Sequence, residues 1–223
     1  MTIKELKDKM CIPADANKEY IEQKFESIAE VLKSGCVVKY NEEEYRFLDF
    51  EFYFFNRNHQ DISVHPRISD ALCWYINDFG GIDLNFESNI IKLHVVKNNK
   101  LSFKYKLTDD SYFGGILIRQ LQRLSDNMIY DGPYKVAELF RTLDATSQRQ
   151  NNPILVMKQL EPIGLWERKK RHNLLGSQKN VKAKANYNIK ECFIGITESK
   201  RHDLEVNLSS FVKSKYRYLL KTI

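Results

Sequence analysis

The chain has 223 residues, of which 43% are hydrophobic and 12% aromatic, so its apolar side chains suffice for a sizeable core and exclude wholesale disorder. Its net charge is +6, but residues 151–223 carry a balance of +9 and the first 150 residues one of −3. No apolar run approaches the roughly 18 residues that span a bilayer, and the charged N-terminus does not look like a secretory signal.

The first two predicted elements are helices. Residues 2–10 are short and charged, whereas Glu19–Lys33 places apolar side chains on one stripe, at spacings of four, three and four residues. Asn17 is a suitable N-cap for this second helix, and Gly35 a suitable end. The residues of the stripe are Ile21, Phe25, Ile28 and Leu32.

Most of the remaining elements are predicted strands, separated by turn-like stretches such as NEEE and KNNK. One further helix, Tyr134–Leu143, is expected after Gly132-Pro133. Gly80-Gly81 interrupts two strand-like runs and suggests a sharp bend. The other predicted strands and apolar segments are Cys36–Tyr40, Glu44–Asn56, Ile90–Val96, Leu101–Leu107, Tyr112–Leu121, Ile154–Leu160, Phe193–Thr197 and Tyr216–Leu220.

These elements form hairpins rather than regular βαβ units. The expected fold is therefore α+β, with a mixed or antiparallel sheet and surrounding helices. We expect one domain over residues 1–223, with residues 1–18 as an N-terminal extension and residues 165–190 as a basic surface segment.

The stretch FLDFEFYFFNR, residues 47–57, places two carboxylates in an otherwise aromatic strand. Because residues two apart on a strand share a face, Asp49, Glu51 and Tyr53 are expected on the same side. There a carboxylate could activate water beside a planar base stacked on an aromatic ring. Alternatively, both acids pair with a buried base such as Arg119 and are structural. The expected faces are Tyr45, Phe47, Asp49, Glu51, Tyr53 and Phe55 against Arg46, Leu48, Phe50, Phe52 and Phe54.

Other chemistry-bearing residues give weaker signals. His59 and His65 lie in a polar loop and could serve acid–base chemistry or bind a metal, but their spacing matches no standard zinc motif and loop histidines are mostly just exposed. The four cysteines form no C-x-x-C pair, which argues against zinc or disulfides and favours the cytoplasm. The basic run RKKR (168–171) could contact phosphates or be a solvated face. Motifs for nucleotide hydrolysis, dinucleotide redox, serine hydrolysis and zinc proteolysis are missing.

Five fragments, taken in order over about residues 30–220, resemble the alkyladenine (3-methyladenine) DNA glycosylase family. LDFEFY (48–53) is similar to its V-E-T-E-A-Y strand, and GGILIRQLQRL, which contains Arg119, to its R-x-x-E-P-type strand. GPYKV (132–136) is similar to its G-P-[SG]-K-L helix start. FIGITE (193–198) and KYRY (215–218) are similar to its R-I-G-I-x-[KR] and P-W-R-F-Y segments.

The resemblance implies a base-excision enzyme that flips a damaged nucleotide out of duplex DNA and hydrolyses its N-glycosidic bond. Glu51 would be the catalytic residue that activates water to attack C1′. The base-binding residues would be Tyr53 below the base, His65 on its other face and Asn85. His65 is preferred to His59 because Pro-Arg follows it. The implied enzyme needs no metal, cofactor or covalent lysine intermediate, and is a monomer that binds double-stranded DNA and no membrane.

The resemblance also implies DNA contacts and shows two departures. The family's wedging tyrosine falls at Phe79 if the match is made on Gly80, or at Asp78 if it is made on Asn85. A small residue of the family becomes Phe52 here. The alternatives are a catalytically inactive nucleic-acid-binding relative with Glu51 structural, or a pocket for another nucleobase-like ligand. The expected DNA-binding residues are Phe79, Arg119, Lys135, Arg168, Lys169, Lys170 and Arg171.

Overall fold

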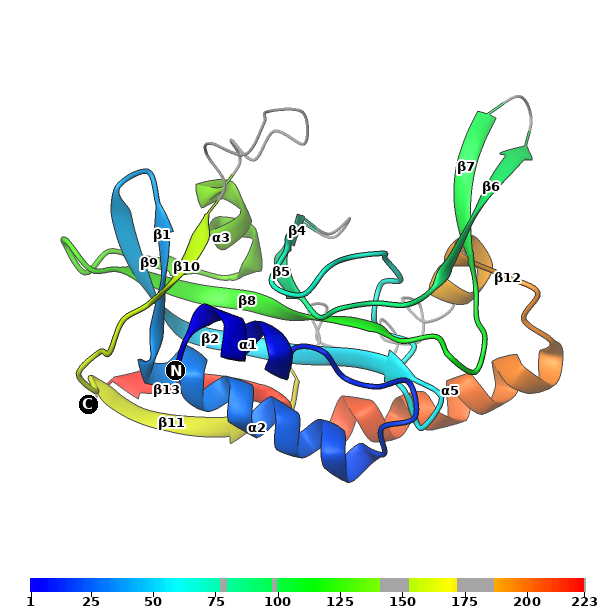
Figure 1. Cartoon of the computed structure of the whole chain (residues 1–223), viewed down its shortest axis with the longest axis horizontal. Helices are drawn as coiled ribbons and strands as arrows, with labels where there is room; N and C mark the ends of the chain where they lie inside the picture. Colours follow the sequence, from blue (N-terminus) through cyan, green and yellow to red (C-terminus); the bar gives the residue numbers. More distant parts are fainter. Residues whose placement is uncertain (77–79, 98–99, 141–152, 172–186, 223) are drawn as a thin grey trace.

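Two long antiparallel strands, β2 (Glu43–Asn56) and β8 (Phe113–Arg123), form the middle of the fold, as a computed structural model of the chain shows (Figure 1). The structure describes all residues except 77–79, 98–99, 141–152, 172–186 and 223. Aromatic side chains make up half of β2, and the first seven residues of β8 are buried, which suits a sheet covered on its faces.

Within these described residues the main sheet has ten strands, and its pairs are antiparallel. One edge of β2 pairs first with β1 (Cys36–Tyr40) and further along with β13 (Arg217–Thr222), because β2 is long enough for both. On the far side of β8 lie β5 and then β4. The other strands of this sheet are β3 (His59–Gln60), β4 (Trp74–Ile76), β5 (Ile82–Asn85), β9 (Ile129–Asp131), β10 (Ile154–Met157) and β11 (Gly164–Lys169).

The helices α1 (Ile3–Lys9) and α2 (Lys18–Ser34) cover one face of this sheet and confirm both N-terminal helix predictions. The Asn17 side chain accepts a hydrogen bond from the Tyr20 N–H at 2.8 Å, and Gly35 ends α2 as expected. The predicted stripe is buried, and Phe25 stacks on Phe52 with ring centroids 4.5 Å apart. Residues 1–18 are no mere extension, because they contribute Leu6, Met10, Ile12 and Ala16 to the same core.

A second, smaller sheet comprises the hairpin β6 (Ile91–Lys97) and β7 (Lys100–Lys106), with β12 (Phe193–Ile194) parallel to β7. The hairpin is the predicted one, and it stands out from the body in Figure 1. Beside its foot, η1 (Asn188–Cys192) and α5 (Glu198–Lys213) enclose a second apolar core. This core contains Phe55, Ile62, Phe113, Ile189, Leu204 and Leu208.

An irregularity in the pairing of β2 with β8 corrects the predicted face assignment. Pairing shifts between Phe47 and Asp49 and shifts back between Asp49 and Phe50, so neither strand gains a residue. The strict alternation of faces is interrupted between Phe47 and Phe50, which are three residues apart and both lie in the main core. Tyr45 and Phe47 therefore join Phe50 and Phe52 in the main core, against our expectation. The expected alternation holds from Asp49 onward. On the side opposite α2, Asp49 and Glu51 both lie next to Arg119, and Tyr53 donates a hydrogen bond to Glu51.

Three other segments differ from the expectations. The strand predicted over Phe193–Thr197 is only two residues long, because Gly195 has a positive φ of 73° and Thr197 caps the unpredicted helix α5. Strand β11 was not predicted in the basic stretch. The helix expected over Tyr134–Leu143 is α3 (Pro133–Leu139), ending at Phe140, and residues 141–143 lie outside the described part.

The fold class is thus α+β with a mostly antiparallel, curled sheet and few helices, arranged as one domain. Across the described residues, no helix combines the length and apolar character needed to cross a membrane.

Candidate functional site

Four charged side chains form a closed ring on the face of the main sheet opposite α2. They are Asp49 and Glu51 on β2, Arg119 on β8 and Arg217 on β13. The strand register places Arg217 opposite Glu51, so acidic and basic groups alternate around the ring. We call these four residues the charge quartet. All four are largely buried, and Glu51 is 0% exposed.

The four sides of the quartet are unequal. The Arg217 Nε donates to Asp49 Oδ1 at 2.9 Å and its Nη2 donates to Asp49 Oδ2 at 2.5 Å, which makes a tight two-pronged pair. Arg119 lies 3.6 Å from both Asp49 Oδ2 and Glu51 Oε2, and Arg217 Nε lies 3.9 Å from Glu51 Oε1. These three separations exceed hydrogen-bond length. Arg119 Nε and Nη1 are buried and make no hydrogen bond within the described residues. The pairing with Arg119, considered as the structural alternative, is therefore present.

Tyr53 holds the Glu51 carboxylate directly. Its hydroxyl donates a hydrogen bond to Glu51 Oε2 at 2.6 Å. Burial, together with the nearby Glu51 charge, raises the pKa of Tyr53 well above its ordinary value, so the phenol stays protonated and remains a donor. The Arg171 guanidinium lies 4.7 Å from the centre of the Tyr53 ring and pairs with the fully buried Asp61. One face of the Tyr53 ring is thus occupied by a cation.

Across β8, a second buried ion pair continues the polar face. The Arg67 Nη1 lies 2.9 Å from Asp83 Oδ2, and its guanidinium stacks over Tyr75 at 4.6 Å. A Cβ added at Gly115 would overlap Arg67 Nη2, so glycine makes room for this guanidinium. The His65 ring also stacks on Tyr75, with ring centroids 6.2 Å apart and ring planes at 19°.

Asn85 lies in line with Tyr53, because both pair with Gly115 from opposite sides of β8. Its Nδ2 donates to Ser69 Oγ at 2.7 Å. Its Oδ1 is buried and has no hydrogen-bond partner among the described residues. The structure therefore brings five residues that the sequence singled out separately onto one face: Glu51, Tyr53, His65, Asn85 and Arg119.

His59 is not part of this face. It lies in the core, with its ring nitrogens 2.7 Å from the Phe54 carbonyl oxygen and 3.2 Å from the Tyr216 hydroxyl. Burial lowers the pKa of His59, despite the nearby Asp61 charge, so the ring stays neutral at physiological pH. Of the two loop histidines, only His65 lies next to the polar face.

The expected basic surface segment, residues 165–190, begins in strand β11, which places its basic side chains on different faces. Neighbouring residues of β11 point to opposite faces: Arg168 pairs with Glu26 of α2, whereas Lys169 pairs with Glu167 at 3.4 Å. Arg171 is buried against Asp61, so the RKKR run is not a continuous exposed patch. Lys170 is exposed, and so is Lys135 on α3; neither residue belongs to the charge quartet. Phe79 and Asp78, the two wedge candidates, lie outside the described residues.

The site also contains four residues that were not expected from the sequence: Asp61, Arg67, Asp83 and Arg217. One signal was available for two of them: Asp83 stands in the apolar run GIDLNF and Arg217 in the aromatic run YRY, where an unpaired charge would be costly. No local signal marks Asp61 or Arg67, since both lie in polar loops. The described residues contain no group of three or more His, Cys, Asp or Glu side chains able to hold a metal ion.

This polar face can serve two purposes, one structural and one chemical. Carboxylates Asp49, Glu51, Asp61 and Asp83 balance guanidiniums Arg67, Arg119, Arg171 and Arg217, which suits a rigid structural network. At one point, however, hydrogen-bond donors of Arg119 are unused next to a carboxylate held by a phenol. Such a place can position water or an anionic ligand beside a general base.

Comparison with known proteins gives one distant relative. The chain is 32% identical over 125 residues to "Uncharacterized protein L759" of Acanthamoeba polyphaga mimivirus, a match covering 54% of this chain and 56% of that protein. The chain thus matches only about half the length of this relative. No family model matches the chain, and no solved structure does. Neither a family nor an activity follows from this likeness.

Proposed function

We propose that this protein is a base-excision DNA glycosylase with an alkyladenine-glycosylase-like fold. It would hydrolyse the N-glycosidic bond of an alkylated or otherwise damaged purine. One observation supports this proposal above all: Glu51 and Tyr53 of β2 share one face of the sheet with His65, Asn85 and Arg119, which come from three other parts of the chain. The proposal includes duplex DNA as partner, a monomeric cytoplasmic protein and no cofactor.

In this proposal Glu51 acts as a general base. It takes a proton from water as the water oxygen bonds to C1′, and the purine leaves with the electrons of the glycosidic bond. The Tyr53 hydroxyl orients the carboxylate. The Arg119 Nη1, which lies 3.6 Å from Glu51 Oε2 and makes no hydrogen bond within the described residues, holds the water or a neighbouring phosphate. Asp49 is a supporting residue, because Arg217 occupies both of its oxygens.

The flipped base would stack on Tyr53. Since Arg171 covers one face of that ring at 4.7 Å, the base takes the other face. Asn85 Oδ1 accepts a hydrogen bond from the edge of the base, which gives this buried oxygen its partner. Electron-poor alkylated purines are good leaving groups, so a single carboxylate base is enough.

A second candidate is a catalytically inactive nucleic-acid-binding relative of the same fold. The observation that favours it is the 0% exposure of Glu51 together with its position between Arg119 and Arg217. A carboxylate in such a place can be wholly structural. The two candidates differ in one outcome: removing the charge of Glu51 abolishes base release only if the protein is an enzyme.

The test is base release from methylated duplex DNA, scored as 3-methyladenine freed and as abasic sites formed. Wild-type protein should release base, and Glu51→Gln should lower the single-turnover rate by about 10²–10⁴. Glu44→Gln is the matched control, because Glu44 is a carboxylate of the same strand that pairs with Lys158 at the surface. Salt-sensitive DNA binding without release by the wild type would establish the second candidate. Neither binding nor release would sink both.

A further inference from the structure

The β6–β7 hairpin is a strongly basic projection, and we call its two strands, residues 91–97 and 100–106, the arm. It contains five lysines and no acidic residue. Its foot is anchored, because β12 pairs with β7 at Tyr105 and Lys106, and the Lys104 ammonium donates to the backbone carbonyls of Lys190 and Glu191. The rest of the arm stands away from the body (Figure 1).

The arm also exposes apolar side chains toward its outer end. Val96 and Leu101 face each other across the hairpin and are 71% and 62% exposed, and Phe103 is 45% exposed. The Lys92 ammonium lies 3.9 Å from the centre of the Phe103 ring. A projecting hairpin with uncovered apolar groups among lysines needs a partner that is polyanionic and also offers apolar contact.

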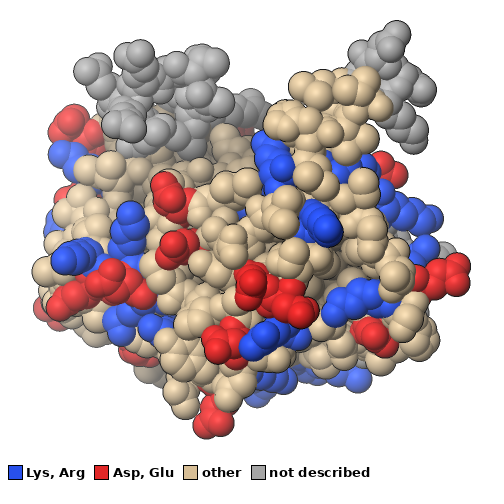
Figure 2. All heavy atoms as spheres, turned by 45° about the vertical axis from the view of Figure 1, so that its right-hand side comes forward, with Lys and Arg blue, Asp and Glu red and all other residues tan. Residues whose placement is uncertain are grey.

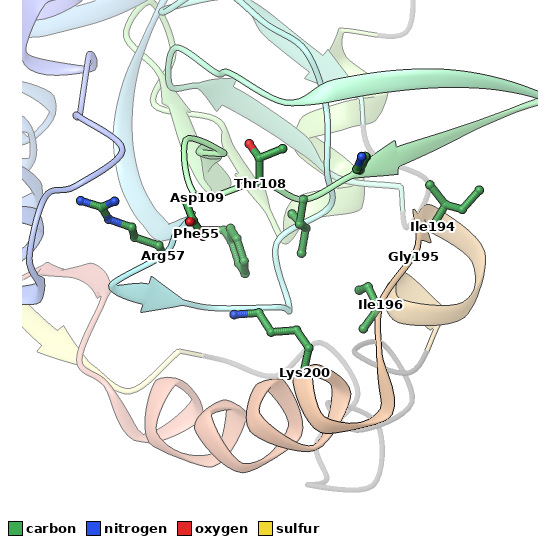
Figure 3. Close-up of a pocket in the computed structure, with 10 residues that line it drawn as sticks. Phe55, Arg57, Thr108, Asp109, Ile194, Gly195, Ile196 and Lys200 are labelled. Atoms are coloured by element: carbon green, nitrogen blue, oxygen red, sulfur yellow. The ribbon is translucent and has the colours of Figure 1, made fainter.

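The foot of the arm opens into a pocket of about 150 Å³ (Figure 3). Three segments supply basic side chains to it: Lys106 from the end of β7, Arg57 just after β2, and Lys200 from the first turn of α5. Figure 2 shows Lys and Arg side chains gathered below the arm, whereas positive and negative groups are mixed lower on the same face.

The pocket carries an excess of positive charge. Within the described part of the chain, none of Arg57, Lys106 and Lys200 makes an ion pair with an acidic side chain. Asp109 is the acidic residue among the lining side chains, and it leaves a net charge of +2. Thr108 adds a hydroxyl, and Phe55 forms an apolar part of the wall. Such a lining favours a phosphate group.

We propose that the arm and this pocket bind the backbone of duplex DNA, with a phosphate in the pocket and the arm in the adjoining groove. The proposal rests on the proposed function as far as the choice of DNA is concerned. Seven residues per strand give the arm a length of roughly 23 Å at about 3.3 Å per residue. A major groove about 12 Å wide admits a two-stranded β-ribbon.

This surface differs from the one expected from the sequence. The RKKR run was expected to bind phosphates, but Arg171 is buried and Arg168 pairs with Glu26. The arm and pocket instead draw on residues 57, 91–97, 100–106 and 200, which are far apart in the chain.

The experiment measures binding of an undamaged fluorescent duplex by anisotropy over a range of salt concentrations, in the Glu51→Gln protein. The pocket variant Arg57→Gln/Lys106→Gln/Lys200→Gln should reduce the slope of log K against log salt by about 0.9, since the pocket holds one phosphate and each lost phosphate contact removes about 0.9. The control variant Lys4→Gln/Lys7→Gln/Lys18→Gln removes the same charge from exposed N-terminal lysines and should leave the slope unchanged.

An arm variant, Val96→Ser/Leu101→Ser/Phe103→Ser, should weaken binding at all salt concentrations with little change of slope, because it removes apolar contacts only. Equal slopes for pocket and control variants would overturn the proposal, as would tighter wild-type binding to single-stranded RNA of the same length. Both readouts use binding alone. Failure of base release with an intact slope effect would therefore contradict only the enzymatic activity.

Discussion

The Tyr53 hydroxyl donates a hydrogen bond to Glu51 Oε2 at 2.6 Å, between two positions on the same face of β2. The phenol keeps its proton, because burial raises its pKa well above the ordinary value. The carboxylate that the proposed chemistry depends on is thus oriented by its own strand.

Replacing Tyr53 with Phe removes this donor and keeps the aromatic ring. We expect unfolding to become easier by about 1.5–3 kcal/mol, the usual worth of a hydrogen bond to a charged group. Urea unfolding followed by circular dichroism measures the change. Tyr20→Phe, at an exposed position of α2, is the control and should alter stability by much less. Equal effects of the two substitutions would mean that the Tyr53–Glu51 bond contributes nothing.

Gly115→Ala should destabilise the protein through Arg67. The new methyl group overlaps Arg67 Nη2 and lies 3.2 Å from the Asp83 Cβ, so the Arg67–Asp83 pair must shift. Overpacking of this kind costs about 1–3 kcal/mol. The check is a double-mutant cycle: in an Arg67→Ala background the same substitution should cost far less. Strict additivity of the two changes would contradict this account.

Stability should fall as the pH drops below about 6.5, the ordinary pKa of histidine. Burial lowers the pKa of His59 in the folded state. As the pH falls, the unfolded chain therefore binds the proton before the folded chain does, and the free energy of unfolding decreases. Unfolding free energies at pH 7.5, 6.5 and 5.5 test this, with His59→Asn expected to flatten the profile. His202→Asn, an exposed site on α5, should leave the profile as it is.

A second loss of stability is expected below about pH 4. Burial alone would raise the pKa of Asp61, but the Arg171 charge and the hydrogen bonds from Arg171 and Ser63 outweigh burial and lower it. The stabilisation from this pair is therefore complete above the unfolded pKa and is lost as the pH falls toward the folded one. Arg171→Met should remove this part of the acid transition.

Thiol labelling should separate the four cysteines. Cys73 is exposed, whereas Cys36 is buried and burial raises its pKa to about 12. Cys11 is half-buried with its pKa raised to about 11 by burial and by Glu87, and Cys192 is buried. In the folded protein one thiol should therefore react rapidly with a disulfide reagent at pH 8, and Cys73→Ser should abolish that phase. Rapid reaction of Cys36 would contradict its burial.

The predicted elements that the structure confirms have signals contained within a few residues. Helix α2 has an N-cap at Asn17, a buried stripe and an end at Gly35. The arm has a turn-like KNNK between two alternating strands. Helix α5 escaped prediction because its buried residues, Leu204, Leu208 and Phe211, lie among many polar ones and the preceding FIGIT reads as a strand.

The irregular pairing near Asp49 shows a limit of periodicity. An alternating pattern predicts faces correctly only while the pairing is regular, and Tyr45 and Phe47 lie on the face opposite to the expected one. Nothing in FLDFEF distinguishes an interruption from normal alternation, since both of its faces are rich in aromatic rings.

The sequence by itself determined helices α1, α2 and α3, the main strands and the position of Glu51 and Tyr53 on one face, because caps, turns and alternation act between near neighbours. Only the tertiary structure decided which charges meet. Arg217 reaches Asp49 from 168 positions away, and Arg171 leaves its basic run to pair with Asp61 from 110 positions away. Burial makes an unpaired charge costly, so strand pairing across the whole chain selects the partners, and no local pattern encodes that choice.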